Sequence, residues 1–133
     1  METKANRKAW GNNEGQSLVE FALVVPLLLL LVIGIAEFGR AWMTRNIMTG
    51  AAREAVRMYA VKDDTAAARA RADQILSSAG LDSARATITD NVFGESVSYT
   101  IEYRFPVVVV GFIPGLANTE IPLTSTTTMR KEY

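Results

Sequence analysis

The chain has 133 residues, and its 14 lysine and arginine side chains are balanced by 14 aspartates and glutamates, giving a formal net charge of zero. A neutral chain of this length has room for one modest domain and no electrostatic reason to bind nucleic acid. It contains neither cysteine nor histidine, which removes disulfides, thiol nucleophiles, imidazole bases and the commonest zinc ligands. We therefore expect no metal site, no cofactor and no enzymatic activity.

The first predicted element is an apolar run from Leu18 to Ala36, in which Glu20 is the one charged residue. As a helix these 19 residues would measure roughly 28 Å, which matches the hydrocarbon thickness of a bilayer. So small a chain could not surround a helix that is apolar on every face, so a membrane span is favoured over a buried core helix. Pro26 lies early in the run and predicts a kink, which membrane helices tolerate.

The basic residues that flank this run predict its orientation. Lys4, Arg7 and Lys8 precede the run, and lysine and arginine near a span favour the cytoplasmic side. The N-terminus is therefore expected inside and the C-terminal domain outside. Arg40 and Arg45 follow the run and reduce this asymmetry.

A secretory signal peptide is the alternative interpretation of the same run. Residues 34–36, Gly-Ile-Ala, offer the small-x-small pattern of a signal peptidase site, and cleavage there would release a soluble protein. Against it, the basic residues end ten positions before the run, at Lys8, whereas a signal peptide places them next to it. Glu20 and Pro26 also interrupt what should be a simple apolar block.

Glu20 requires an explanation, because an ionisable group near hydrocarbon is costly and usually has a partner or a purpose. One explanation is that its side chain reaches back to the lipid headgroups. The surrounding sequence GQSLVEF supplies another, since Gly15 stands five residues before Glu20, where a polar leader meets the apolar run. This arrangement resembles the prepilin processing signal, in which a membrane-embedded aspartyl peptidase cuts after the glycine. The resemblance implies that the mature chain begins at Gln16 and that Glu20 neutralises the new α-amino group of an adjacent subunit.

The longer sequence GQSLVEFALVVPLLLLLVIGIAEFGRAW, followed by GAAREAVRMYA, resembles the TadE-like pseudopilins of the tight-adherence (Flp) pilus system. The resemblance implies that Gly15 and Gln16 flank the cleavage site and that Glu20, Phe21 and Pro26 belong to the subunit-assembly helix. Major Flp pilins usually have tyrosine after the glutamate and are much shorter, whereas removing 15 of the 133 residues here would leave 118. The chain therefore resembles a minor component of the pilus. Glu14 departs from the family, because many prepilins carry a basic residue before the cut.

This resemblance implies a domain organisation and a set of partners. Residues 1–15 would form a cytoplasmic leader peptide, residues 16–38 a transmembrane and assembly helix, and residues 39–133 an extracytoplasmic head. The implied partners are the prepilin peptidase, other pilins or pseudopilins, the inner-membrane pilus assembly platform and the lipid bilayer. The alternative is an extracytoplasmic binding domain unrelated to pili, either uncleaved or released by signal peptidase.

After the membrane exit the helix is predicted to continue, and a second helix follows it. The first has a 3.6-residue apolar period that Arg45 interrupts. The second is predicted within residues 62–81, with Asp63, Asp64 or Thr65 as its N-cap and Gly80 as its C-cap. The apolar positions of the first helix are Ala41, Trp42, Met48, Ala52, Ala55, Val56 and Tyr59.

From Arg85 onward the apolar period changes to two, which predicts β-strands. Strands are expected around Ile88, from Val97 to Phe105 and within EIPLTSTTTMRKE, with DNVFGES as the turn between the first two. Three antiparallel strands against two helices make a small α+β, pilin-like head. The apolar segment PVVVVGFIPGL, bounded by Pro106 and Pro114, is expected to form either a buried strand end with a tight loop or an exposed docking patch.

Overall fold

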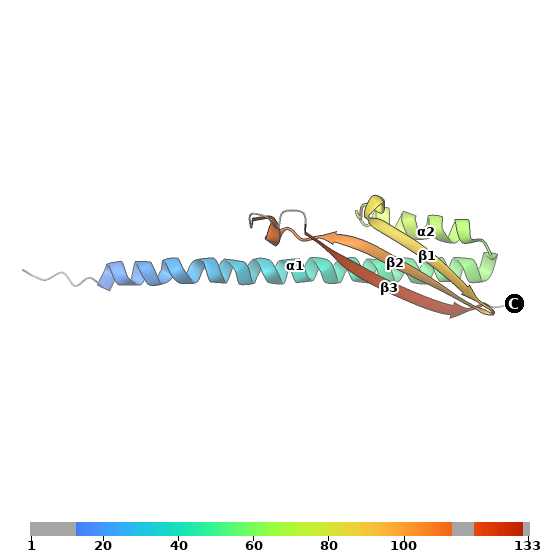
Figure 1. Ribbon diagram of the computed structural model, residues 1–133, viewed down its shortest axis with the longest axis horizontal. Coiled ribbons are helices and arrows are strands. Elements are labelled where there is room, and N and C mark those ends of the chain that lie inside the picture. Colours follow the sequence, from blue (N-terminus) through green and yellow to red (C-terminus); the bar gives the residue numbers. More distant parts are fainter. Residues whose placement is uncertain (1–12, 113–118, 132–133) are drawn as a thin grey trace, which may run out of the picture. The chain divides into compact units, whose positions relative to one another are not determined.

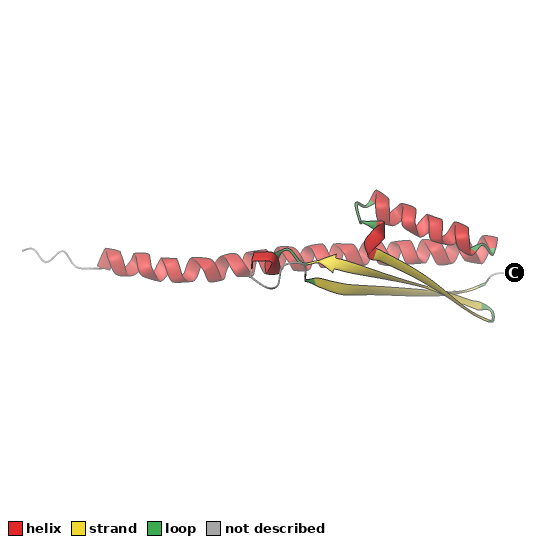
Figure 2. Ribbon diagram, turned by 45° about the horizontal axis from the view of Figure 1, so that its top comes forward, coloured by secondary structure: helices red, strands yellow, loops and turns green. Residues whose placement is uncertain are grey.

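The computed structural model describes residues 13–112 and 119–131. It contains two α-helices and one three-stranded sheet, with two short 3₁₀ helices, which confirms the predicted α+β fold (Figures 1 and 2). The leader before Asn13 and the predicted turn residues Pro114 and Gly115 lie outside the described residues. The elements are α1 (Asn13–Lys62), α2 (Thr65–Ser78), η1 (Ser83–Arg85), β1 (Ala86–Phe93), β2 (Ser96–Pro106), η2 (Val109–Phe112) and β3 (Glu120–Arg130).

The chain divides into two compact units, Met1–Ile35 and Ala36–Tyr133. The described part of the first unit is the N-terminal portion of α1 alone. The second unit, called the head below, contains the rest of α1 together with α2 and the sheet.

The core of the head forms where α1 and α2 cover one face of the sheet (Figure 1). The predicted strand alternation is confirmed, because every second residue of β2 from Val97 to Phe105 is buried. Trp42 was expected on the buried face of α1, but its side chain is 57% exposed and its ring stacks on Phe38. The buried face passes through Thr44 instead, and Arg45 is exposed, so the arginine does not interrupt it. The buried apolar residues of the helices are Met48, Ala51, Ala52, Ala55, Val56, Tyr59, Ala68, Ala72 and Leu76.

Both predicted caps of α2 are present. Of the three N-cap candidates the structure selects Asp64, whose Oδ1 accepts hydrogen bonds from the backbone N–H groups of Ala66 and Ala67, at 2.9 and 3.1 Å. Gly80 follows the last helical turn with a φ of +78°, which glycine adopts without steric penalty. The backbone N–H groups of Gly80 and Leu81 then donate to carbonyls of the last turn, forming a Schellman motif.

Asp63 joins the two helices and holds the end of the sheet. Its φ is +52°, and its backbone N–H donates to the carbonyl of Tyr59, 2.8 Å away. Lys131, just after β3, donates to the Asp63 carboxylate at 3.0 Å and places its ammonium 4.9 Å from the centre of the Tyr59 ring. The hydrogen bond from Lys131 lowers the pKa of Asp63 and raises the pKa of Lys131.

The sheet has the order β1-β2-β3, with both neighbouring pairs antiparallel. The first turn is shorter than DNVFGES predicted, because β1 continues to Phe93 and only Gly94 and Glu95 lie between the strands. Asp90, expected in the turn, lies opposite Tyr99 in the sheet and forms an ion pair with Arg69 of α2. Gly94 has a φ of +57°, the conformation that such a tight turn requires.

The apolar segment after β2 combines parts of both predicted alternatives. Val107 packs against the core, and its backbone N–H donates to the carbonyl of Thr119 at 3.1 Å, which closes the connection between β2 and β3. Val108, the next residue, is 52% exposed. This segment is therefore half-buried at Val107, Val109 and Val110 and exposed at Val108.

Candidate processing and assembly site

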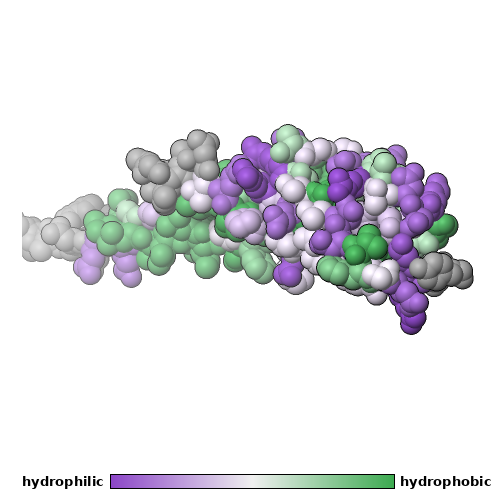
Figure 3. Space-filling view, turned by 45° about the vertical axis from the view of Figure 1, so that its right-hand side comes forward, coloured by the Kyte–Doolittle hydropathy of each residue, from purple (hydrophilic) through white to green (hydrophobic). Residues whose placement is uncertain are grey.

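The N-terminal part of α1 exposes apolar side chains on all its sides. Leu18 is 71% exposed and Leu23 74%, and the most apolar 18-residue window of the helix has no buried share. Figure 3 shows this part as a nearly continuous apolar surface. Among the described residues, α1 is the one helix long and apolar enough to cross a membrane. Because it is not buried in its own chain, this helix is consistent with a single-pass membrane anchor and not with a soluble core helix.

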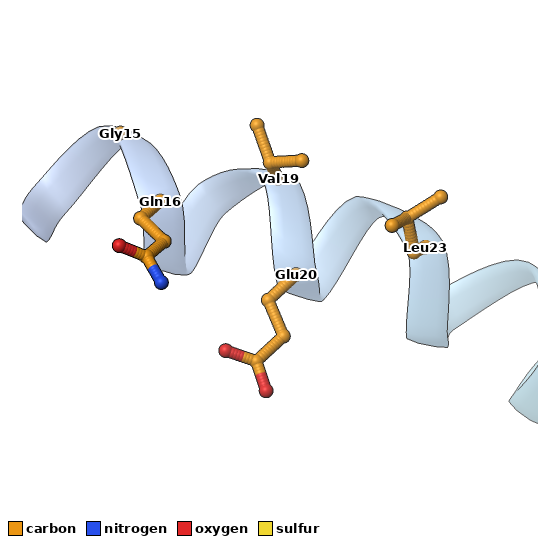
Figure 4. Close-up of a pocket in the computed structure, with 5 residues that line it drawn as sticks. All are labelled: Gly15, Gln16, Val19, Glu20 and Leu23. Atoms are coloured by element: carbon orange, nitrogen blue, oxygen red, sulfur yellow. The ribbon is translucent and has the colours of Figure 1, made fainter.

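Gly15, Gln16, Val19, Glu20 and Leu23 line a shallow hollow at the start of this helix. The side chains of Gln16 and Glu20 point to one side of the helix, and those of Val19 and Leu23 point to the other (Figure 4). Their spacing of four residues gives this arrangement, since residues four apart share a helical face. All five residues belong to one helix, so the hollow is an open face that could enclose a ligand only against a second molecule.

Glu20 is the charged member of this face. Its side chain is exposed, and among residues 13–112 and 119–131 no hydrogen bond or ion pair satisfies its carboxylate. Phe21, the next residue, is 69% exposed. Placing an unpaired carboxylate in an apolar environment costs free energy, so we expect Glu20 to have a partner outside its own chain.

Gly15 is a helical residue of α1. A Cβ added at Gly15 would meet no atom within 4 Å, so this glycine is not required for packing within the chain. Glycine lowers helix stability by about 1 kcal/mol relative to alanine, so the helix unwinds more easily at Gly15 than it would at an alanine.

Pro26 lies within α1, which continues through it as one helix. Proline has no N–H group, so the carbonyl four residues earlier, at Ala22, loses its helical donor. The other predicted site residues lie within about three turns on the N-terminal side, and the structure thus places all five on one continuous helix. It brings Gly15, Gln16 and Glu20 together in the same hollow, while Phe21 and Pro26 lie outside its lining.

The head contains a second hollow, of about 380 Å³, whose lining includes Arg40 and Arg85. Arg40 donates to Glu37 at 2.8 Å. Arg85 donates to Glu120 at 2.9 Å and lies 3.6 Å from Asp82. Both guanidinium groups are thus matched by carboxylates, so the hollow has no excess positive charge with which to hold an anion.

The head also has contacts that the sequence pattern did not predict. Arg40 places its guanidinium 5.2 Å from the centre of the Phe105 ring, and Phe38 stacks on Trp42 with ring centres 6.2 Å apart. The stacked pair could have been found from its i, i+4 spacing, but the Arg40 contact could not, because Phe105 is distant in sequence. In the part of the chain that the structure describes, no group of three His, Cys, Asp or Glu side chains could hold a metal ion.

Comparison with known proteins gives a match at this site. Residues 15–57 match the family model described as TadE-like protein. The match begins at the glycine of the predicted cleavage site and ends within α1, so it covers the apolar run and most of the core residues that α1 contributes to the head. No curated protein and no solved structure matches the chain. Over residues 15–57 this chain is therefore similar to the TadE-like protein family.

Proposed function

We propose that this protein is a minor pseudopilin that takes part in assembling a pilus of the Tad (Flp) type, used for adherence or secretion. The observation that carries the proposal is Glu20, an exposed and unpaired carboxylate in an exposed apolar helix, inside the segment that matches the TadE-like family. A prepilin peptidase removes residues 1–15, residues 16–38 span the bacterial inner membrane, and residues 39–133, which make up nearly all of the head, are extracytoplasmic. The N-terminus is cytoplasmic before cleavage.

The physical basis of assembly is exchange of one apolar environment for another. Before assembly, lipid surrounds the exposed side chains of α1, and afterwards helices of other pilins or pseudopilins replace the lipid. Gly34 has no side chain, so a neighbouring helix can approach closely there. The position is also open, because a Cβ built on Gly34 would meet no atom of its own chain within 4 Å. The carboxylate of Glu20 then pairs with the α-amino group that cleavage creates on an adjacent subunit. This charge-assisted hydrogen bond would select the axial register between subunits.

The first experiment maps the N-terminus of the protein extracted from membranes. We expect the native chain to begin at Gln16 and to stay in the membrane pellet at alkaline pH. The Gly15→Val variant should accumulate as the uncut precursor, because the added side chain obstructs the peptidase and not the fold. Gly34→Val is the matched control, since Gly34 is also helical with open space around it, and its cleavage should be normal.

Two outcomes of this mapping would contradict the proposal. An intact leader on the native chain would favour an uncleaved single-span protein. A soluble protein beginning at Glu37 would favour release by signal peptidase, as the small residues before Glu37 allow.

The second experiment tests the role of Glu20 separately from cleavage. The Glu20→Gln variant keeps the side-chain shape and loses the charge, so it should be processed normally yet enter sheared pili less well. A charged hydrogen bond is worth about 1.5–3 kcal/mol, which corresponds to a loss of roughly tenfold or more. The control is Glu14→Gln, whose residue leaves with the leader. Normal incorporation of the Glu20→Gln chain, measured by immunoblot of the pilus fraction, would show that charge pairing is not the assembly mechanism.

A further inference from the structure

Contacts along the head show which of its parts lie at the Ala36 end. The hydroxyls of Thr49 in α1 and Ser125 in β3 are 2.8 Å apart, and farther along both elements Lys131 reaches Asp63. The strand and the helix therefore run in the same direction. Ile121 lies four residues before Ser125, which is about 13 Å along the strand. The same length corresponds to about nine residues of a helix. Counting back nine residues from Thr49 places Ile121 beside residue 40 of α1.

A contact of Arg40 independently supports this position of Ile121 along α1. Its guanidinium lies 5.2 Å from the centre of the Phe105 ring, and Phe105 is opposite Ile121 in the register of β2 and β3. The connection between these strands starts and ends here, where Val107 bonds to Thr119. Val108 therefore leaves the sheet at the level at which α1 enters the head.

Exposed apolar side chains gather at this level on different sides of the molecule. Phe38 is 70% exposed and Trp42 57%, while Val108 and Ile121 are 52% and 49% exposed. Successive helical residues are about 100° apart, so Phe38 and Trp42 each lie about 200° from Arg40, which faces the sheet. The aromatic pair and the strand-end residues thus lie on opposite sides of α1 but at the same height. These four residues, Phe38, Trp42, Val108 and Ile121, are called the apolar belt below.

A protein partner would cover one side of the head, whereas a lipid surface surrounds the chain on all sides at one position along α1. The apolar belt fits a lipid surface, because its residues lie on opposite sides of α1 at the same position along the helix. It begins two residues after the apolar run ends at Ala36. Aromatic residues are enriched at the boundary between hydrocarbon and headgroups, and Phe38 and Trp42 supply two of them here.

We infer that the head is seated in the headgroup region of the bilayer through the apolar belt, with Val108 and Ile121 as membrane contacts far in sequence from the spanning helix. The inference rests on the proposed function, because it requires α1 to be in a membrane. Before assembly the head is therefore held against the membrane surface on two sides of α1. Extracting the subunit must remove the belt from lipid as well as the helix.

The test uses single-tryptophan variants of the full chain, since Trp10 and Trp42 are its two tryptophans and both can be changed to phenylalanine. The chain is reconstituted in phosphatidylcholine and phosphatidylglycerol vesicles whose acyl chains carry bromine near the headgroups. Bromine quenches tryptophan by contact, so the Val108→Trp and Ile121→Trp variants should lose most of their emission. Phe93→Trp is the matched control, because Phe93 is 69% exposed but lies at the β1–β2 turn, and its emission should be unchanged.

A fourth variant, Leu29→Trp, tests whether α1 itself is in the membrane, and it is measured in vesicles brominated near the ends of the acyl chains, because Leu29 lies near the middle of the apolar run. If it is quenched while Val108→Trp and Ile121→Trp are not, α1 is in the membrane and the head is not seated there, which overturns this inference alone. That result would also be obtained if the belt served only contacts between subunits. If Leu29→Trp is not quenched either, the membrane placement on which the proposed function depends is wrong as well.

Discussion

Tyr99 is the most deeply buried large side chain of the sheet, and its hydroxyl is a cost to the fold. The residue is 0% exposed, and its oxygen has no hydrogen-bond partner among the described residues. Burial raises the pKa of Tyr99 to about 12, so the phenol stays neutral at physiological pH. Tyr59, whose ring centre is 6.3 Å away, differs because its hydroxyl interacts with the Asp63 carboxyl and helps to lower the pKa of Asp63.

This contrast predicts that replacing tyrosine by phenylalanine changes the free energy of unfolding in opposite directions at residues 99 and 59. Tyr99→Phe removes an unsatisfied buried hydroxyl, so the free energy of unfolding should stay the same or rise by up to about 1–3 kcal/mol. Tyr59→Phe removes a hydroxyl that interacts with Asp63 and should lower the free energy of unfolding by about 0.5–1.5 kcal/mol. Denaturant unfolding of both variants in detergent measures the difference. If Tyr99→Phe is the more destabilised of the two, the Tyr99 hydroxyl has a hydrogen-bond partner in the folded protein.

At the scale of elements, the features that the sequence predicted well are those fixed by local chemistry. The alternation of β2 follows from burial of one sheet face, and Asp64 and Gly80 cap α2 through backbone groups a few residues away. Trp42 was misplaced because a helical period identifies an apolar face but not how far its tertiary cover extends. Asp90 was misplaced because its polar side chain is typical of turns, whereas its ion pair with Arg69 depends on where α2 lies.

The candidate site was predictable for a related reason. Gly15, Gln16 and Glu20 are within six residues of one another, so their arrangement on a helix follows from sequence spacing alone. The belt was not predictable in this way, because Val108 and Ile121 reach the level of Trp42 only through the register of β2 and β3 and their packing on α1. Whether Glu20 has a partner depends on other molecules, which neither the sequence nor a single chain contains.

At the scale of the whole molecule, the two units are stabilised by different surroundings. The head has a core of its own, in which residues of α1, α2 and β2 exclude water from one another. The N-terminal portion of α1 exposes its large side chains, so packing against the rest of its own chain does not stabilise it. A change in one unit should therefore leave the folding of the other unaffected.

Two leucine substitutions test this independence. Leu76 is 0% exposed in the head core, so Leu76→Ala should lower the free energy of unfolding of the head by about 2–5 kcal/mol. Leu29 lies in the first unit and is 52% exposed, so Leu29→Ala should change head stability by less than about 0.5 kcal/mol. Hydrogen exchange of the β2 amides in detergent measures opening of the head in both variants. Faster exchange in the Leu29→Ala chain, comparable with that of Leu76→Ala, would mean that the spanning helix and the head fold as one cooperative unit.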